Sequence, residues 1–307
     1  MKNKTLRCIL SCVGTLALFV SAVTPISTVT APVAEAAPQT RQLITPIGYK
    51  MVNGKQDREN PLSAPDLLVD PGYSETRPNF GDQENNEDVI GTDDRYEVKD
   101  ATQYPYRWVG TLTFTLESGK RVSCTGSLIG PDSVVTSGHC LSDKFTDMTF
   151  SPGQNGDSKP FGTANVTQVW MDENKRSEQD IERDWAVAKL DQPLGNKAGW
   201  FGMKSADNES LYGKSTTIIG YPVDKDKNTM WVGHGRIFSE ERGLFYHDTD
   251  TYYGNSGSSV LDERGTIYGI HYGGNAQSAV STRITHNIFN VLANITNRSA
   301  EDLAQSR

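Results

Sequence analysis

Three residues far apart in the chain have the types and surroundings needed to activate a serine hydroxyl. Ser256 lies in the run 254–258 (GNSGS), His139 lies in the run 136–140 (TSGHC), and Asp184 directly precedes an apolar stretch. A serine hydroxyl is a weak nucleophile at neutral pH, so it needs a base to accept its proton and a carboxylate to orient that base. The chain therefore offers a candidate base, orienting acid and nucleophile, in the order His, Asp, Ser.

The immediate neighbours of Ser256 suit a reacting serine. Gly254 and Gly257 flank it, and glycine lets the backbone turn sharply and expose the hydroxyl. The same freedom allows the amides of Gly254 and Ser256 to converge on one point, as an oxyanion hole requires. Taken alone, the run fits a plain turn equally well, so its interpretation depends on the other two residues.

The contexts of His139 and Asp184 leave a structural role open for each. His139 follows a short β-rich run and a stretch of small residues, although a lone histidine is more often structural than catalytic. Asp184 stands at the start of the apolar run 185–190, where a carboxylate can be buried against an imidazole. A surface position is the alternative, because Asp180 and Glu182 are near in sequence. Asp184 is favoured because it alone directly abuts the apolar run.

The chain has four cysteines, and two of them bear on the candidate base. Cys124 and Cys140 are sixteen residues apart, and Cys140 directly follows His139. An even pair in an oxidising compartment predicts a disulfide, which would pin the loop that carries His139. Two free buried thiols are the alternative. No metal or other cofactor is expected, because further ligands at the spacing of a zinc finger are missing.

Residues 1–36 have the pattern of a signal peptide. The start is basic, an apolar stretch comes next, and residues 34–36 (AEA) offer the small residues of a cleavage site. A membrane anchor is the alternative, but the apolar run is short and is interrupted by polar residues. We therefore expect a secreted, extracellular protein. The formal net charge of −8 argues against a nucleic-acid or anionic-membrane partner.

Residues 37–88 differ in composition from the remainder of the chain after Asp88. The segment is rich in Pro, Asn, Asp and Glu and shows no sustained hydrophobic period. Such a segment cannot bury enough apolar surface to fold strongly by itself. We interpret it as a pro-segment whose acidic end, residues 84–88, is an exposed processing site. A linker without a processing role is the alternative. The folded domain is expected over residues 89–307.

From Val89 onward, short β-rich runs separated by Gly, Pro, Asn and Asp predict an all-β sandwich or barrel. The run 109–116 alternates in part, with threonines on one face and larger apolar residues on the other. The other expected strands cover residues 122–128, 133–136, 164–171, 185–190, 216–220, 233–238, 258–261 and 266–271. One helix is expected over residues 284–295, where apolar residues share a face.

These motifs together resemble the chymotrypsin superfamily, and in particular the glutamyl endopeptidases of Gram-positive bacteria, the staphylococcal V8 group. The shared features include the cysteine pair ending in Gly-His-Cys, the Asp before an apolar strand and the Gly-x-Ser-Gly motif. The runs 89–95 (VIGTDDR), 104–107 (YPYR) and 269–274 (GIHYGG) also match that group. The resemblance covers about residues 89–295. One departure is Ser259, where the group usually has proline, and this should alter a turn more than the chemistry.

The resemblance implies a fold and a set of catalytic roles. The fold is all-β, with two six-stranded antiparallel barrels, a C-terminal helix and an active site in the cleft between the barrels. The implied catalytic residues are His139, Asp184 and Ser256, and the implied oxyanion hole is formed by Gly254 and Ser256.

The resemblance also implies a pocket that binds an acidic side chain. The group binds the substrate carboxylate through a Thr or Ser five residues before the nucleophile and a His on a later strand, which match Thr251 and His271. A hydroxyl donor beside an imidazolium suits a carboxylate. Asp250 leaves a second interpretation open, because it stands six residues before Ser256, where trypsin-like enzymes place the Asp that binds Lys or Arg.

Asn255 and Val89 bear on activation. Trypsin-like zymogens pair a new α-amino group with an Asp just before the nucleophile, and the neutral Asn255 cannot form that ion pair. In the V8 group the new amine lies near the specificity pocket and helps to bind the acidic side chain. The matching residue here is Val89, so the resemblance implies that the pro-segment blocks substrate binding until it is cut.

The sequence thus predicts a secreted serine endopeptidase, made as a zymogen, that hydrolyses peptide bonds after Glu and more weakly after Asp through an acyl-enzyme. The expected partners are protein and peptide substrates and an activating protease, and the chain is expected to act as a monomer. Two alternatives stay open. One is a serine protease with basic (Lys/Arg) or narrow, toxin-like specificity, and the other is a non-catalytic binding protein on the same fold.

Overall fold

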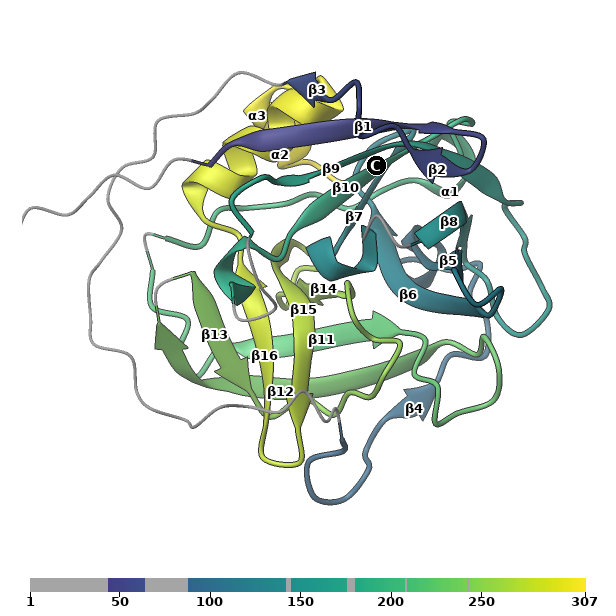
Figure 1. Cartoon of the computed structure of the whole chain (residues 1–307). Helices are drawn as coiled ribbons and strands as arrows, with labels where there is room; N and C mark the ends of the chain where they lie inside the picture. The colour runs from purple at the N-terminus through teal and green to yellow at the C-terminus, as the bar shows by residue number, and fades with distance from the viewer. Residues whose placement is uncertain (1–43, 64–87, 142–144, 176–179, 208, 242) are drawn as a thin grey trace, which may run out of the picture. The chain divides into compact units, whose positions relative to one another are not determined.

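A computed structural model of the chain describes residues 44–63, 88–141, 145–175, 180–207, 209–241 and 243–307. The expected signal peptide, residues 1–36, lies outside the described residues, as does most of the expected pro-segment. The described residues form twelve barrel strands in two antiparallel sheets, with short strands and helices added at their edges (Figure 1).

Six consecutive strands close into an N-terminal barrel. They are β5 (Val109–Leu116), β6 (Arg121–Leu128), β7 (Ser133–Thr136), β8 (Phe145–Pro152), β9 (Ala164–Asp172) and β10 (Ala186–Leu190). Their hydrogen-bonded order is β10–β7–β6–β5–β8–β9, and a further pairing of β9 with β10 closes the ring. Leu112, Phe150 and Val187 are fully buried in the core of this half, as expected where one face of each strand turns inward.

Six later strands close into a C-terminal barrel. They are β11 (Ser215–Gly220), β12 (Trp231–Glu241), β13 (Leu244–His247), β14 (Ser259–Leu261), β15 (Ile267–Asn275) and β16 (Ser278–Arg283). Their order is β11–β14–β15–β16–β13–β12, closed by pairing of β11 with β12, and β4 (Tyr96–Glu97) extends the sheet beside β12. Ile218, Phe245 and Val260 form part of its core. The predicted fold of two six-stranded antiparallel barrels is confirmed.

The helices are short except for one near the C-terminus. They are η1 (Tyr106–Trp108), η2 (Gly138–Leu141), η3 (Ile181–Arg183), α1 (Gly195–Ala198), α2 (His286–Thr296) and α3 (Ala300–Leu303). Helix α2 begins where the Thr285 side chain accepts a hydrogen bond from Ile288 N, and it ends at Asn297 in the left-handed conformation. The predicted helix over 284–295 is therefore confirmed. No helix in the described parts of the chain is long and apolar enough to cross a membrane.

The structure differs from expectation in part of the segment 37–88, for which no strand was expected. Residues 44–63 carry β1 (Pro46–Val52), β2 (Lys55–Gln56) and β3 (Leu62–Ser63), and β1 joins β9 of the N-terminal barrel. Asn53 and Gly54, both with positive φ, form the two-residue turn between β1 and β2. These strands obtain their pairing and burial from the barrel, which explains how a segment too polar to fold alone is nevertheless ordered.

Candidate active site

The pairing of β7 with β10 brings His139 and Asp184 together although they are 45 residues apart. Strand β7 ends at Thr136, directly opposite Ala186 at the start of β10. The chain after β7 forms η2, which carries His139, and Asp184 lies two residues before β10. Antiparallel neighbours place the end of one strand beside the beginning of the other, so the two side chains meet at one rim of the N-terminal barrel.

Two hydrogen bonds join His139 to Asp184. The Nδ1 atom of His139 lies 2.7 Å from Asp184 Oδ2, and the backbone N–H of His139 donates to Asp184 Oδ1 at 2.9 Å. Asp184 is fully buried, whereas the side chain of His139 is 20 % exposed. An ionised carboxylate can only accept, so Nδ1 carries the proton and Nε2 remains the basic nitrogen. The geometry fits an imidazole held in one tautomer and orientation.

Asp184 stays ionised despite its burial. Burial by itself would raise the pKa of its carboxyl, but the charge and hydrogen bonds of His139, together with the charge of Lys175, lower the pKa below its usual value. The Lys175 ammonium lies 3.4 Å from Asp184 Oδ1. Lys175 was not singled out from the sequence, because only the fold shows that it reaches this carboxylate.

Ser256 lies in the loop between β13 and β14 of the C-terminal barrel, and this loop is bonded to the other barrel. Thr125 of β6 donates its backbone N–H to Ser256 O at 2.9 Å and its hydroxyl to Gly254 O at 2.8 Å. Tyr272 of β15 contacts both candidate residues. Its carbonyl lies 3.4 Å from Ser256 Oγ, and its ring packs edge-on against His139 with centroids 5.3 Å apart. Tyr272 is therefore a neighbour of both Ser256 and His139.

The two glycines around Ser256 are required by the shape of its loop. Gly254 and Gly257 have φ of +97° and +82°, values that L-residues with side chains rarely adopt. A Cβ on Gly257 would lie 2.0 Å from Thr136 Oγ1, and one on Gly254 would lie 2.3 Å from Tyr221 O. The interpretation of this run as a sharp turn around Ser256 therefore has a steric basis.

A disulfide links Cys124 of β6 to Cys140 of η2, with their Cα atoms 6.2 Å apart. Cys140 Sγ also lies 3.7 Å from Ser256 O. The predicted disulfide is thus present, and it ties the turn that carries His139 to the strand that holds the Ser256 loop.

His271 is placed in the interior of the C-terminal barrel, on β15, and is fully buried. Burial, and in smaller measure the charges of His247 and His139, lowers its pKa well below the ordinary value. Burial thus favours the neutral ring in the unliganded protein. The carbonyl of His271 accepts bonds from Gly257 N and Ser137 Oγ, both at 2.9 Å, so its strand contacts the loops of both Ser256 and His139. Thr251 is buried as well, with 2 % of its surface exposed.

A second buried histidine, His247 of β13, lies next to His271 inside the C-terminal barrel. Their ring centroids are 5.9 Å apart, and His247 Nε2 lies 2.9 Å from Ser281 Oγ. Burial lowers the pKa of His247 from 6.5 to about 3. This residue was missed from the sequence because residues 244–247 were not recognised as a strand, although Leu244, Phe245 and Tyr246 form a short apolar run before it.

Asp250 is turned toward the N-terminal segment of the folded domain. Its two carboxylate oxygens accept hydrogen bonds from Ile90 N at 2.8 Å and Asp94 N at 3.1 Å, and only 3 % of the residue is exposed. Burial raises the pKa of Asp250 above its usual value, and the neighbouring charges of Asp94 and Asp93 act in the same direction, while the two N–H donors oppose them. Both oxygens of the Asp250 carboxylate thus already accept hydrogen bonds from backbone N–H groups of the protein.

The segment after Val89 is fixed by charged side chains as well. Arg95, whose side chain is 1 % exposed, pairs with Asp93 at 2.9 Å and with Asp224 at 2.6 Å. Val89 itself is half-buried, and its N–H donates to the side chain of Asp88 at 2.8 Å. Val89 therefore directly precedes Ile90, whose backbone N–H donates a hydrogen bond to Asp250.

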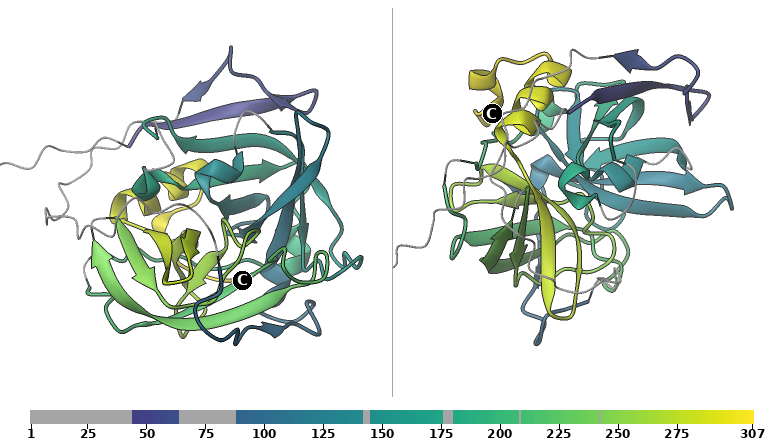
Figure 2. Two further views of the ribbon diagram at one scale, coloured as in Figure 1. Left: turned by 60° about the horizontal axis from the view of Figure 1, so that its bottom comes forward. Right: turned by 60° about the vertical axis from the view of Figure 1, so that its left-hand side comes forward.

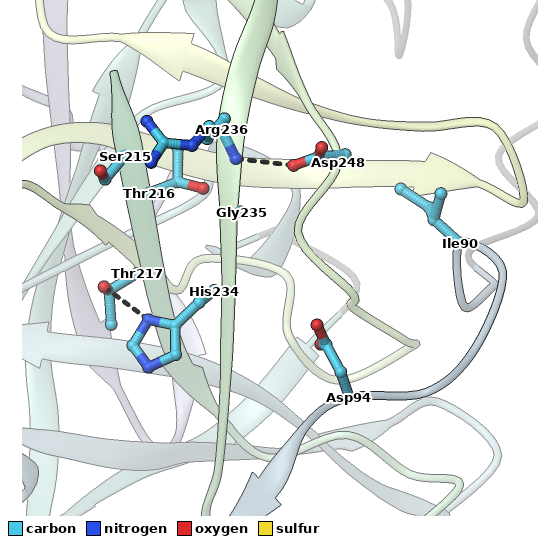
Figure 3. Close-up of a pocket in the computed structure, with 9 residues that line it drawn as sticks. All are labelled: Ile90, Asp94, Ser215, Thr216, Thr217, His234, Gly235, Arg236 and Asp248. Atoms are coloured by element: carbon cyan, nitrogen blue, oxygen red, sulfur yellow. Dashed lines mark hydrogen bonds between the residues drawn. The ribbon is translucent and has the colours of Figure 1, made fainter. Parts of the chain in front are cut away.

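Ile90 and Asp94 also form one wall of an open groove of about 650 Å³ on the C-terminal barrel (Figure 3). The other lining residues are Ser215, Thr216, Thr217, His234, Gly235, Arg236 and Asp248. Within the groove, Asp248 accepts the Arg236 N–H at 2.6 Å, and His234 lies 3.0 Å from the Thr217 hydroxyl. None of the three candidate catalytic residues lines it, so the groove is separate from the reactive centre.

Comparisons with known proteins match this chain to a protease family and to several proteases. The model of the trypsin family matches residues 96–293. A glutamyl endopeptidase of Bacillus licheniformis is 36% identical over 223 residues, which cover 67% of this chain and 68% of the relative. A Bacillus subtilis protein named extracellular metalloprotease is 34% identical over 211 residues, covering 66% of this chain and 67% of that protein. A solved Glu endopeptidase structure superimposes with a TM-score of 0.63 at 29% identity, covering 68% of this chain and all of the other.

The name of the Bacillus subtilis relative raises the question of a metal. In the described part of the chain, one group of three potential ligands lies close enough to share an ion, namely Cys124, His139 and Cys140. The two sulfurs are bonded to each other, and His139 Nδ1 is directed at Asp184. Metal ligation requires thiolates, so these residues do not fit a metal site.

Proposed function

The chain belongs to the trypsin family and is a serine endopeptidase, and from this premise we propose that it is a secreted zymogen whose active form cleaves peptide bonds after Glu and, more weakly, after Asp. One observation carries the choice of an acidic over a basic substrate. The carboxylate of Asp250, which stands where trypsin-like enzymes read Lys or Arg, is already bonded to Ile90 N and Asp94 N. A buried acid with both oxygens engaged offers little to a basic side chain.

The proposed chemistry uses Ser256, His139 and Asp184. Ser256 Oγ attacks the carbonyl carbon of the scissile bond while His139 Nε2 accepts its proton. The same nitrogen then protonates the leaving amine, and water hydrolyses the resulting ester of Ser256 by the reverse sequence of proton transfers. Asp184, 2.7 Å from His139 Nδ1, stabilises the imidazolium that forms on the way. The amides of Gly254 and Ser256 stabilise the oxyanion.

The proposed pocket for the substrate carboxylate is formed by Thr251 and His271. A neutral imidazole still offers one N–H donor, and the Thr251 hydroxyl offers another. A substrate carboxylate that enters this buried site favours protonation of His271, because an opposite charge nearby raises the pKa of a histidine. Glu is preferred over Gln in this scheme, since the amide supplies no negative charge.

The proposed zymogen is activated by cleavage between Asp88 and Val89. Asn255 has no charge to pair with a new ammonium, whereas Val89 directly precedes Ile90, whose N–H is held by Asp250. A new ammonium at Val89 would therefore lie near Asp250 and its neighbour Thr251. This position supports a role of the amine in attracting the substrate carboxylate. An activating protease is needed for the cut, and the chain is proposed to act as a monomer.

Secretion is supported by the sequence pattern of residues 1–36 and by the word extracellular in the name of the Bacillus subtilis relative. The disulfide between Cys124 and Cys140 is also typical of proteins that leave the cytosol. The boundaries of the signal peptide (1–36), the pro-segment (37–88) and the protease domain (89–307) are part of the proposal.

The proposed specificity is tested with three peptide substrates that differ only in the residue before the scissile bond, namely Glu, Gln or Lys. We expect kcat/KM to be highest for Glu. We expect His271→Ala to lower it about ten- to a hundredfold, the value of one charge-assisted hydrogen bond. Asp250→Asn should leave kcat/KM for the Lys peptide unchanged. A protein that cleaves the Lys peptide best would refute the proposal, and Ser256→Ala is the control for contaminating proteases.

A further inference from the structure

We propose that the hairpin formed by residues 44–63 remains bound to the protease after the chain is cut, as a non-covalent strand of the N-terminal barrel. The proposal rests on the proposed cleavage between Asp88 and Val89. Figures 1 and 2 show β1 lying along β9 on the side of the N-terminal barrel that faces away from the C-terminal barrel. The hairpin belongs to the same compact unit as both barrels.

The first observation is that β1 occupies an edge that the barrel leaves open. Among the described residues, β8 pairs with only the first two residues of β9, Ala164 and Asn165. The later residues, from Gln168 to Asp172, pair with five residues of β1 on one side. On the other side, Gln168 to Met171 pair with β10. Without β1, the N–H and C=O groups on that side of the strand would face solvent, and such an edge is a template for strand addition.

The second observation is that the hairpin contributes apolar surface and shape to this contact. Ile44 and Tyr49 are 8% and 7% exposed and pack within the core of the barrel. Gly48 lies flat against the ring of Trp170, and a Cβ at this position would come within 2.6 Å of it. Removing the hairpin would uncover this surface, so the hydrophobic effect favours its retention.

The third observation connects the hairpin to the reactive centre. The side-chain amide of Gln56 donates to Leu141 O at 2.7 Å, and Leu141 ends the turn η2 that carries His139. At the turn between β1 and β2, Asp147 N of β8 donates to Gly54 O at 2.9 Å. The hairpin thus bridges β9, β8 and the chain that positions the catalytic base. We infer that it supports η2 as well as closing the edge.

The test uses the secreted chain with Ser256→Ala, so that no self-digestion occurs, and with a recognition sequence for a site-specific protease placed directly before Val89. The folded protein is cut and then analysed by size-exclusion chromatography at micromolar concentration. We expect the fragment that contains residues 44–63 to elute with the fragment that begins at Val89. Separation of the two wild-type fragments would overturn the proposal. Because the Ser256 hydroxyl is removed, the result does not depend on the proposed specificity.

Two substitutions sharpen the test. Gly48→Val adds a side chain against Trp170, and overpacking of this kind typically costs enough to weaken binding about ten- to a hundredfold. Lys55→Ala, on an exposed side chain of β2, is the matched control and should leave the retention unchanged. If Gly48→Val prevents folding of the intact chain, a synthetic peptide of residues 44–63 that carries the same substitution should fail to displace the wild-type fragment, while the wild-type peptide displaces it.

The contact with η2 is tested by hydrogen exchange on the same cut protein. Gly48→Val, which weakens binding of the hairpin in the cut protein, should speed exchange of the amides in residues 138–141. Gln56→Ala should do so in part while the fragment stays bound. Unchanged exchange in both cases would contradict the support of η2 by the hairpin.

Discussion

Replacing His247 with Gln should make the protein markedly less sensitive to acid. In the folded protein, burial lowers the pKa of His247 from 6.5 to about 3. Between these values the unfolded chain binds a proton that the folded protein does not. His247 therefore does not reduce the free energy of unfolding above pH 6.5, but it lowers that free energy progressively as the pH falls below 6.5. At pH 5 the loss amounts to about 2 kcal/mol, from about 1.36 kcal/mol for each pH unit below the unfolded value.

The assay is urea unfolding of the Ser256→Ala protein at pH 8 and pH 5, with and without His247→Gln. Glutamine keeps a nitrogen near the position of His247 Nε2, which bonds Ser281, but it does not titrate. We expect the variant to lose about 2 kcal/mol less stability than its parent between the two pH values. The exposed His286 offers the control His286→Gln, which should leave the difference unchanged. An equal loss in His247→Gln and its parent would refute the reasoning.

Three further predictions concern the proposed catalytic residues and the contacts that support them. Asp184→Asn should lower kcat by about 10⁴ with little change in KM, measured on the preferred peptide, because His139 loses its orienting anion. Replacing Cys124 and Cys140 by Ser should lower the free energy of unfolding by about 3 kcal/mol, the value for a loop of this length, and a loss below about 1 kcal/mol in urea titrations would contradict this. Gly257→Ala should destabilise the fold by about 1–3 kcal/mol, since its Cβ would lie 2.0 Å from Thr136 Oγ1.

The sequence carried most of the information on the two barrels. Short β-rich runs between turn residues matched nine of the barrel strands, but β8, β13 and β16 were missed. Strand β8 contains Asp147 with a positive φ of 52° and a shift of register against β5, so a regular alternation is lost. In β1, the Asn53-Gly54 pair was a hairpin signal that the polar composition of the segment concealed.

The candidate site was identified from local context, but its electrostatics depended on the fold. The order and flanks of His139, Asp184 and Ser256 were visible in the sequence. The neutral state of His271 was not, because it results from complete burial beside a second histidine. The partners of Asp250 were equally hidden, since Ile90 and Asp94 precede it by 160 and 156 residues.

The central claim is that the chain is a serine endopeptidase that selects Glu through its own pocket. The most direct measurement is the cleavage profile of a peptide library digested by protein that begins at Val89, with Ser256→Ala treated in parallel. We predict cuts mainly after Glu, fewer after Asp, and none in the parallel sample. Cuts mainly after Lys or Arg, or cuts that persist in Ser256→Ala, would contradict the account.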